Sequence, residues 1–402
     1  MEQIAVIGIG PGRDACMTAE AAREIAQSEV VYAAARHAHL AGDRHAPLEP
    51  LGAAMEDMSV RRLAGARVAV LLSGDASLYS LLPALTRAFG AEALRVIPGV
   101  GALQSFCAAL REPWQDAAVL SAHGRELSAS ALAHAVRTHA RTFLFCDARH
   151  GPAWACDALA RCGLGEIEIA VGERLSYPDE KITIDAAGAL RGQDFDALSL
   201  ARFHNPAPRK GIPPAGISDE AFLRGKVPMT KREIRALAVS EMRLSPDEIV
   251  WDIGAGTGSV SVECALRCPE GIVYAVERNT DALWLIAQNA EKFGVPNLEI
   301  VPGSAPASLT GLPAPTSVFL GGSGGEMAQI LRLIERFPQP VRLVATAVTL
   351  ESAWSLTREL KRWSRVEAAQ IAVTRLEPVG DYHMFKAQNP VFLISADWEG
   401  TA

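Results

Sequence analysis

The sequence predicts two consecutive α/β domains, and three observations indicate this. Apolar strand-like runs alternate with Ala/Leu-rich helical stretches through the first half of the chain, and the pattern restarts in the second half. A Pro- and Gly-rich segment at 204–219 separates the two series. Glycine-rich loops follow strands in both halves, where α/β sheets bind ligands. We expect domains over 1–205 and 216–402, joined by a linker over 206–215.

The expected strands of the first domain are the apolar runs at 4–10, 29–34, 66–74, 94–99, 116–124, 141–147, 166–173 and 195–203. In the second domain an amphipathic helix at 230–244 precedes strands at 248–254, 271–277, 298–303, 316–322, 341–348, 368–376 and 390–398. Only a short loop separates the last two strands, so we expect them to form an antiparallel hairpin. Strands alternating with helices predict parallel sheets elsewhere.

Composition limits the classes of function. No apolar run is long enough to cross a bilayer, and the N-terminus has no signal-peptide pattern, so we expect a cytoplasmic protein with no membrane partner. The net charge of −7 and pI of about 5.8 disfavour nucleic acid as a partner. Seven cysteines without a CxxC pair, and a His-rich stretch at 36–45 without ligand partners, predict no metal site.

The glycine loop of the second half carries the strongest signal. Asp252 precedes Gly254, Gly256 and Gly258, and an apolar helical run follows. Glu277 ends the next strand, where a carboxylate can accept hydrogen bonds from ribose hydroxyls. The G-x-G-x-G spacing differs from the G-x-G-x-x-G of NAD sites. Together with the preceding acid it resembles the S-adenosylmethionine (SAM) loop of class I methyltransferases.

The segment after the fourth strand of this domain, 319–325, reads FLGGSGG. Class I enzymes that methylate amino groups usually have an Asn/Asp-Pro-Pro-aromatic motif here. Bare backbone in its place disfavours nitrogen methylation of bases. A carbon nucleophile, which needs positioning more than deprotonation, fits better.

The first loop, GIGPGRD at 8–14, does not fit the dinucleotide fingerprint, because Arg13 occupies the place of its third glycine. Further glycine turns follow the strands in 71–80, 96–104 and 120–126. In this order they resemble the tetrapyrrole methylase family, the class III methyltransferases, whose members bind SAM between two α/β lobes. The resemblance continues through 113–117 and 171–182 and covers 1–203. It is greatest to members that methylate C-5 of a corrin precursor.

The C-terminal part, from 216–222 through 226–235 to 389–395, resembles class I enzymes that methylate C-15 and decarboxylate. Together the two resemblances imply a bifunctional C-methyltransferase and decarboxylase of cobalamin biosynthesis. They also imply a polycarboxylate tetrapyrrole substrate, two SAM sites and a homo-oligomer, either a dimer or a tetramer. The alternatives are a SAM-dependent RNA methyltransferase, and a tetrapyrrole-binding N-terminal module fused to a single methyltransferase.

The family motifs assign SAM contacts residue by residue. In the first domain they fall on Gly10, Pro11, Gly74, Asp75, Ser77 and Ala122. In the second they fall on Thr230, Gly254, Ala255, Gly256, Thr257, Gly258, Glu277 and Ala305. Ala76 stands where much of the tetrapyrrole methylase family has a proline, which affects the expected loop shape. Thr230 could instead serve as a plain helix N-cap.

The implied substrate carries many carboxylates, so cationic side chains are expected in both sites. The candidates are Arg13, Arg36, His37, Arg125 and Arg149 in the first domain, and Lys231 and Arg232 in the second. Decarboxylation of an acetate group next to a pyrrole calls for a general acid. We expect His383, with Asp381, to deliver the proton or to bind the departing carboxylate from the hairpin turn at the ligand edge of the sheet. Solvated surface charges and an ordinary loop histidine are the alternative interpretations.

Overall fold

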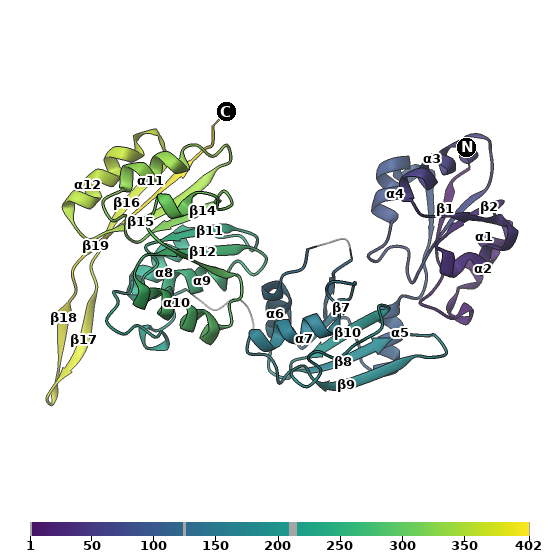
Figure 1. Cartoon of the computed structure of the whole chain (residues 1–402), viewed down its shortest axis with the longest axis horizontal. Helices are drawn as coiled ribbons and strands as arrows, with labels where there is room; N and C mark the ends of the chain where they lie inside the picture. The colour runs from purple at the N-terminus through teal and green to yellow at the C-terminus, as the bar shows by residue number, and fades with distance from the viewer. Residues whose placement is uncertain (1, 124–125, 209–214, 402) are drawn as a thin grey trace. The chain divides into compact units, whose positions relative to one another are not determined.

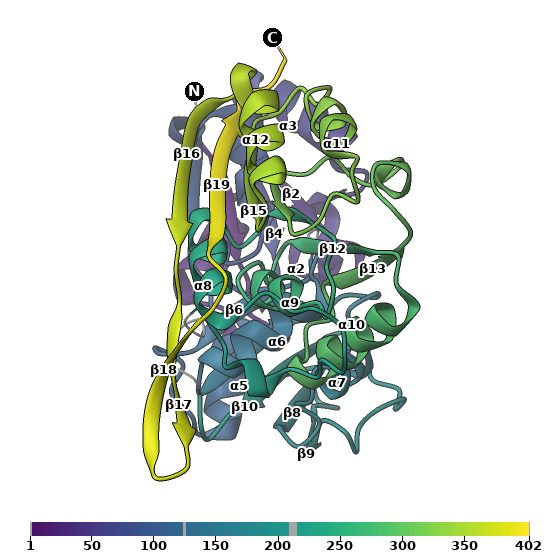
Figure 2. The ribbon, with the colours of Figure 1, turned by 90° about the vertical axis from the view of Figure 1, so that its left-hand side faces the viewer.

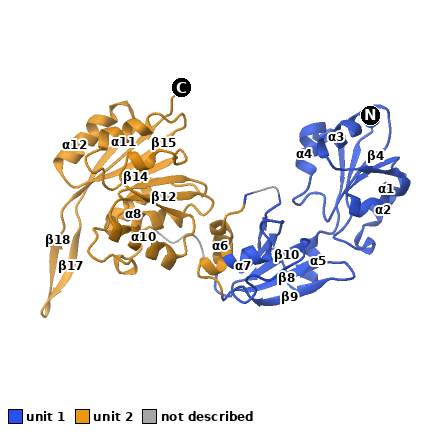
Figure 3. Ribbon diagram, viewed as in Figure 1, with its two compact units in different colours: residues 1–126, 139–157, 166–208 blue, residues 127–138, 158–165, 209–402 orange. Residues whose placement is uncertain are grey.

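The computed structural model describes residues 2–123, 126–208 and 215–401. The chain divides into two compact units (Figures 1 and 3). The first comprises 1–126, 139–157 and 166–208, and the second comprises 127–138, 158–165 and 209–402. Two short segments of the expected first domain therefore group with the second unit. Most of the expected linker lies outside the described residues.

The first sheet of unit 1 is fully parallel, in the order β3-β2-β4-β1-β5. Its strands are β1 (Ile4–Gly8), β2 (Val30–Ala33), β3 (His45–Pro47), β4 (Val68–Leu72) and β5 (Leu94–Ile97), and its helices are α1 (Ala19–Gln27), α2 (Ala38–Ala41), α3 (Leu51–Leu63) and α4 (Leu82–Phe89). Ile4 belongs to a core cluster with Met58 of α3, and the next residue, Ala5, to a second cluster with Ile25 of α1. Both faces are thus covered, as a parallel sheet requires.

The second sheet of unit 1 is mixed, in the order β6-β7-β10-β8-β9, and only the β6–β7 pair is parallel. Its strands are β6 (Ala118–Ser121), β7 (Arg141–Phe145), β8 (Glu168–Glu173), β9 (Lys181–Ala186) and β10 (Ser199–His204). Helix α5 (Ala102–Leu110) packs Phe106 against Phe143. Helices α6 (Ala129–Thr138) and α7 (Pro152–Arg161) lie between its strands in sequence.

Unit 2 contains a seven-stranded sheet in the order β13-β12-β11-β14-β15-β19-β16. Its first five strands are parallel, and β19 is antiparallel to both neighbours. The strands are β11 (Ile249–Ile253), β12 (Ile272–Glu277), β13 (Leu298–Pro302), β14 (Ser317–Leu320), β15 (Val341–Ala347), β16 (Ser364–Ile371) and β19 (Val391–Trp398). This confirms the α/β class predicted for both parts of the chain.

Helices cover both faces of this sheet. The helices are α8 (Arg232–Glu241), α9 (Ser259–Ala265), α10 (Thr280–Phe293), α11 (Met327–Ile334) and α12 (Leu350–Glu359). Val250 of β11 belongs to a core cluster with Ile286 of α10, whereas the adjacent Trp251 belongs to a second cluster with Ile330 of α11. No helix of the described residues is long and apolar enough to span a membrane.

The prediction for the last two strands is wrong in one respect. Strands β16 and β19 are antiparallel as expected, but a further two-stranded ribbon, β17 (Thr374–Val379) and β18 (Tyr382–Ala387), lies between them. Figures 1 and 2 show this ribbon extending away from the sheet. The run at 368–376 looked like one strand because it joins the end of β16 to the start of β17. The turn is instead made at Gly380, whose φ is +60°.

Candidate functional site

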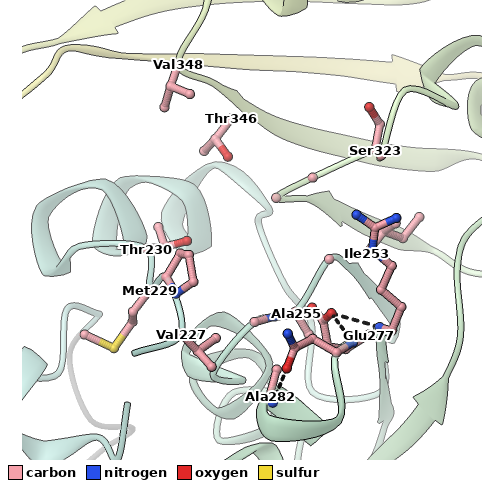
Figure 4. A pocket seen from close by; sticks show the side chains of 18 of the residues that line it. Val227, Met229, Thr230, Ile253, Ala255, Glu277, Ala282, Ser323, Thr346 and Val348 are labelled. Carbon is pink, nitrogen blue, oxygen red and sulfur yellow. Dashed lines mark hydrogen bonds between the residues drawn. The ribbon is translucent and has the colours of Figure 1, made fainter. Parts of the chain in front are cut away.

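A pocket of about 930 Å³ lies in unit 2 at the carboxyl ends of the parallel strands. Its walls come from segments 226–231, 253–256, 276–279, 303–305 and 321–324, together with residues after β15 and at the base of the ribbon. In Figure 4, Ala255 and Glu277 lie on one side, and Thr346 and Val348 lie on the other. Seven of the predicted residues line it: Thr230, Lys231, Gly254, Ala255, Gly256, Glu277 and Ala305.

The glycine loop packs too closely to accept side chains. Gly254 has a φ of +76°, and a Cβ there would lie 2.9 Å from the backbone N and O of Gly322. The loop after β11 is thus pressed against the loop after β14. As a result, this part of the wall is bare peptide that a ligand can approach closely.

Glu277, at the end of β12, is fixed by backbone donors. Its Oε2 accepts a 2.9 Å hydrogen bond from the N–H of Gly256. Its Oε1 accepts from the N–H groups of Arg278 and Asn279, at 2.8 and 2.9 Å (Figure 4). A carboxylate has further lone pairs, so Glu277 can still accept hydrogen bonds from a ligand hydroxyl.

Asp252 lies fully buried behind this loop. Its Oδ2 accepts from the Ser261 hydroxyl, while its Oδ1 has no partner among the described residues. Burial raises the pKa of Asp252 to about 7, and the charge of Glu277 adds to this, although hydrogen bonds from Ser261 oppose it. Thr257 is also fully buried, and neither it nor Gly258 lines the pocket.

A buried ion cluster supports the segment that carries Thr230. Arg235 of α8 is fully buried and donates to Glu263 at 2.6 Å, to Asp219 at 3.2 Å, and to the carbonyl oxygens of Ile217 and Thr230. Sequence reasoning missed this cluster because its members are far apart along the chain.

The first residues of α8 bear on two predictions, the helix-cap role of Thr230 and the substrate contacts of Lys231 and Arg232. The N-cap position of the helix is Lys231, without a side-chain cap. Thr230 is therefore not the helix cap that the alternative interpretation expected. Arg232, the first residue of α8, lies outside the pocket lining, so of the two predicted cations only Lys231 reaches this site.

In unit 1 the structure brings five predicted residues together. Gly10 and Gly74 exchange backbone hydrogen bonds of 3.2 and 2.7 Å, and Pro11 follows, half-buried. Asp75 accepts from the backbone N–H and hydroxyl of Ser77 and from the N–H of Gly99. Burial raises the pKa of Asp75, but these hydrogen bonds outweigh it, so the pKa lies below its ordinary value.

A close contact of three loops surrounds this group. A Cβ on Gly8 would lie 2.7 Å from the backbone N of Gly99 and 2.8 Å from the carbonyl oxygen of Gly74. The loops after β1, β4 and β5 therefore meet as bare backbone. Ala122, in contrast, follows β6 in the second sheet, where it is buried and donates its N–H to Phe145.

Two predicted substrate residues lie beside this site. Arg36 donates to the His37 ring at 3.0 Å and to the hydroxyl of Ser73 at 2.9 Å. His37 is buried, and burial together with the neighbouring Arg36 and His39 lowers its pKa to about 4, so the ring is neutral at pH 7. Arg13 and Arg149 are exposed, and Arg125 lies outside the described residues.

The predicted location of His383 is wrong. His383 lies in β18, where it is exposed and pairs with Pro378, and Asp381 lies in the turn of the ribbon. Neither residue lines the pocket. The ribbon contributes only its base to the pocket, through Val373, Gln388 and Asn389. The structure therefore gives the expected proton-donor role no geometric support.

Comparison with known families defines the class of protein first. A family model described as "Tetrapyrrole (Corrin/Porphyrin) Methylases" matches residues 3–190, and one described as "Precorrin methyltransferase domain" matches residues 220–397. Both halves of the chain are thus methyltransferase domains. Methyl transfer in these families implies SAM as the methyl donor.

Individual relatives narrow this class. Precorrin-6Y C(5,15)-methyltransferase [decarboxylating] of Sinorhizobium sp is 32% identical over 401 residues, covering 96% of this chain and 94% of the relative. The Salmonella typhimurium cobalt-precorrin-6B C(15)-methyltransferase (decarboxylating) is 41% identical over 187 residues, covering 46% and 96%. The solved precorrin-6y C5,15-methyltransferase of Geobacter metallireducens is 38% identical, with a TM-score of 0.44, covering 46% and 98%. The chain belongs to the family of decarboxylating precorrin-6Y C(5,15)-methyltransferases.

Proposed function

We propose that this chain is a cytoplasmic enzyme that binds two SAM molecules, one in each unit. Unit 1 methylates C-5 of a precorrin, and unit 2 methylates C-15 and removes an acetate carboxyl group as carbon dioxide, in cobalamin biosynthesis. One observation carries the proposal. Each unit has a loop contact where a Cβ would collide with backbone, at Gly8 and at Gly254. Beside each contact a carboxylate, Asp75 or Glu277, accepts hydrogen bonds from backbone N–H groups.

The residues of the unit 2 pocket fit SAM. The pocket volume of about 930 Å³ is in the range of small-molecule sites. Glu277 supplies acceptors for ribose hydroxyls, and the bare loop at 254–256 allows close approach. In its ionised form, Asp252 adds negative potential behind the loop through its unpaired Oδ1, and this favours a cationic ligand.

When bound, SAM supplies an electrophilic methyl group on a sulfonium centre. The protein has to align this group with a ring carbon and exclude water, and alignment can contribute ~7–11 kcal/mol. Val227, Met229 and Val348 supply apolar parts of the pocket wall, and the bare glycine loop lets the donor approach the backbone. Neither a metal nor a covalent nucleophile is part of the proposal.

Loss of carbon dioxide calls for an acid inside the pocket, because a protonated ring can accept the electron pair of the breaking carbon–carbon bond. Lys226, Lys231, Asp281 and Glu326 line it. These groups are closer to the chemistry than His383, which lies outside the lining. We propose that the proton comes from this set.

The ribbon supports the proposed homo-oligomer, a dimer or a tetramer. Tyr382 and Phe385 of β18 are 78% and 79% exposed, and Leu376 of β17 is also exposed. Large apolar side chains gathered on one exposed element are typical of association surfaces.

Titration calorimetry of the full chain with S-adenosylhomocysteine tests the two-site proposal. We expect two sites per chain. Gly8→Ala should abolish one and Gly254→Ala the other, because the added methyl group pushes backbone loops apart at each position. A single site in the unaltered chain, lost only in Gly254→Ala, would instead support a binding module fused to one methyltransferase.

Mass spectrometry of the tetrapyrrole product completes the test. The unaltered chain should add two methyl groups and remove one carbon dioxide. Gly8→Ala should retain the decarboxylating methylation, and Gly254→Ala the other methylation. RNA methylation with a steep salt dependence would favour the alternative substrate, and failure to alter a tetrapyrrole at all would refute the proposal.

A further inference from the structure

The pocket of unit 2 contains a cation that the sequence analysis did not consider. Arg278 follows Glu277 at the end of β12 and lines the pocket. Its guanidinium group makes no hydrogen bond or ion pair with any described residue. Arg342, in contrast, forms ion pairs with Asp397 and Glu241. An uncompensated guanidinium in a pocket wall is available to an anionic ligand.

The neighbouring acid does not neutralise this group. Both oxygens of Glu277 accept backbone N–H groups, including that of Arg278 itself. The carboxylate is thereby held toward its own loop. Asp281 and Glu326 also line the pocket, but neither forms an ion pair with Arg278 among the described residues.

The guanidinium group lies beside bare backbone of the β14 loop. Nη1 of Arg278 is 3.7 Å from the position of a Cβ on Gly324. The N–H groups of Ser323 and Gly324 have no acceptor in the described part of the chain. Gly324 and Gly325 both have positive φ values, +59° and +96°. Backbone N–H groups and a guanidinium group are both donors that bind anions in proteins.

We propose that Arg278, with the backbone N–H groups of Ser323 and Gly324, binds a side-chain carboxylate of the tetrapyrrole. This inference rests on the proposed function of the pocket. SAM has no phosphate, and its single carboxylate belongs to the methionine portion, whereas the ribose is the part that Glu277 binds. The donor therefore leaves Arg278 without an anionic partner. The planar guanidinium matches a carboxylate in bidentate geometry. Arg278 thus orients the macrocycle and determines specificity for a polycarboxylate substrate.

The rate of carbon dioxide release measures the activity of unit 2 alone. The rate is determined at saturating SAM over a range of tetrapyrrole concentrations. Arg278→Gln should raise the KM for the tetrapyrrole at least about tenfold, since charged hydrogen bonds are lost. The affinity for S-adenosylhomocysteine should stay within about twofold. Arg278→Lys should recover part of the loss, because it keeps the charge but not the fork. The matched control Arg332→Gln, at an exposed position of α11, should leave this KM unchanged.

Amidation of the substrate side chains provides a second readout. The amidated tetrapyrrole should show little difference between the unaltered chain and Arg278→Gln, because there is no carboxylate to bind. An unchanged KM in Arg278→Gln would overturn the inference. So would a tenfold loss of S-adenosylhomocysteine affinity, because Arg278 would then belong to the donor site. No binding of S-adenosylhomocysteine by the unaltered chain would refute the proposed function itself, and the inference with it.

Discussion

Replacement of Arg235 by methionine should destabilise unit 2 strongly. The Arg235 guanidinium is fully buried between Glu263, which is also fully buried, and Asp219, which is 4% exposed. It also stacks over the ring of Phe222, at 4.7 Å from the centroid. Methionine would fill much of the volume but leave the buried Glu263 with only Arg267, at 4.0 Å, while Asp219 would keep Arg375, at 3.1 Å. Removing one partner of a buried ion pair costs about 3–5 kcal/mol.

The same residue links stability to the pocket, because Arg235 also donates to the carbonyl of Thr230. The midpoint of urea unfolding should fall by about 2 M, because the free energy of unfolding decreases by about 2 kcal/mol for each molar of urea. Hydrogen exchange measured by mass spectrometry on peptides from α8 and α9 distinguishes unit 2 from unit 1. Exchange should also quicken in segment 217–230.

The control is Arg332→Met on the exposed face of α11, which should change the midpoint little. Glu263→Gln in the Arg235→Met background should recover part of the loss, since it removes one uncompensated charge. An Arg235→Met protein with an unchanged midpoint would refute the reasoning. The cluster would then contribute nothing beyond what a hydrophobic side chain supplies.

Three further predictions concern the site. Glu277→Gln should weaken S-adenosylhomocysteine at one of the two sites by about tenfold, and calorimetry showing two unaffected sites would contradict the role of this carboxylate. Asp252, with its pKa raised to about 7 in the folded state against about 3.9 unfolded, should make the protein lose stability as pH rises from about 4 to 7. Asp252→Asn should remove that loss. If the free energies of unfolding of the two proteins change in parallel with pH, the prediction is wrong. His383→Ala should keep both methylation at C-15 and carbon dioxide release, since the side chain is outside the pocket; methylation without decarboxylation would restore its role as the acid.

Much of the fold was predictable because the buried strands are short apolar runs. Strand β11, for example, places Val250 and Trp251 in different core clusters, which its sequence pattern indicates directly. The missed strands lack this signal. Strand β9 is an edge strand with no fully buried residue, and β3 has three residues. The ribbon was missed because all of β18 is exposed, so burial imposes no alternation.

The site was predictable where its chemistry is local in sequence. The glycine spacing at 254–258 and the position of Glu277 at a strand end predict this part of the site. In the structure Glu277 accepts a hydrogen bond from the N–H of Gly256. Arg235 and Arg278 could not be identified in this way, because their roles depend on Glu263 and Gly324, which lie on other elements. His383 was misplaced because an unrecognised strand pair moved it away from the sheet.

The ribbon of β17 and β18 forms an arm that is continuous with the wall of the unit 2 pocket, the chamber in which the ligands are proposed to bind. Val373 and Gln388, at its root, are part of the chamber wall, while Phe385 is exposed farther along it. We therefore expect a partner bound to the arm to alter ligand binding in the chamber, because both share the backbone at Val373 and Gln388.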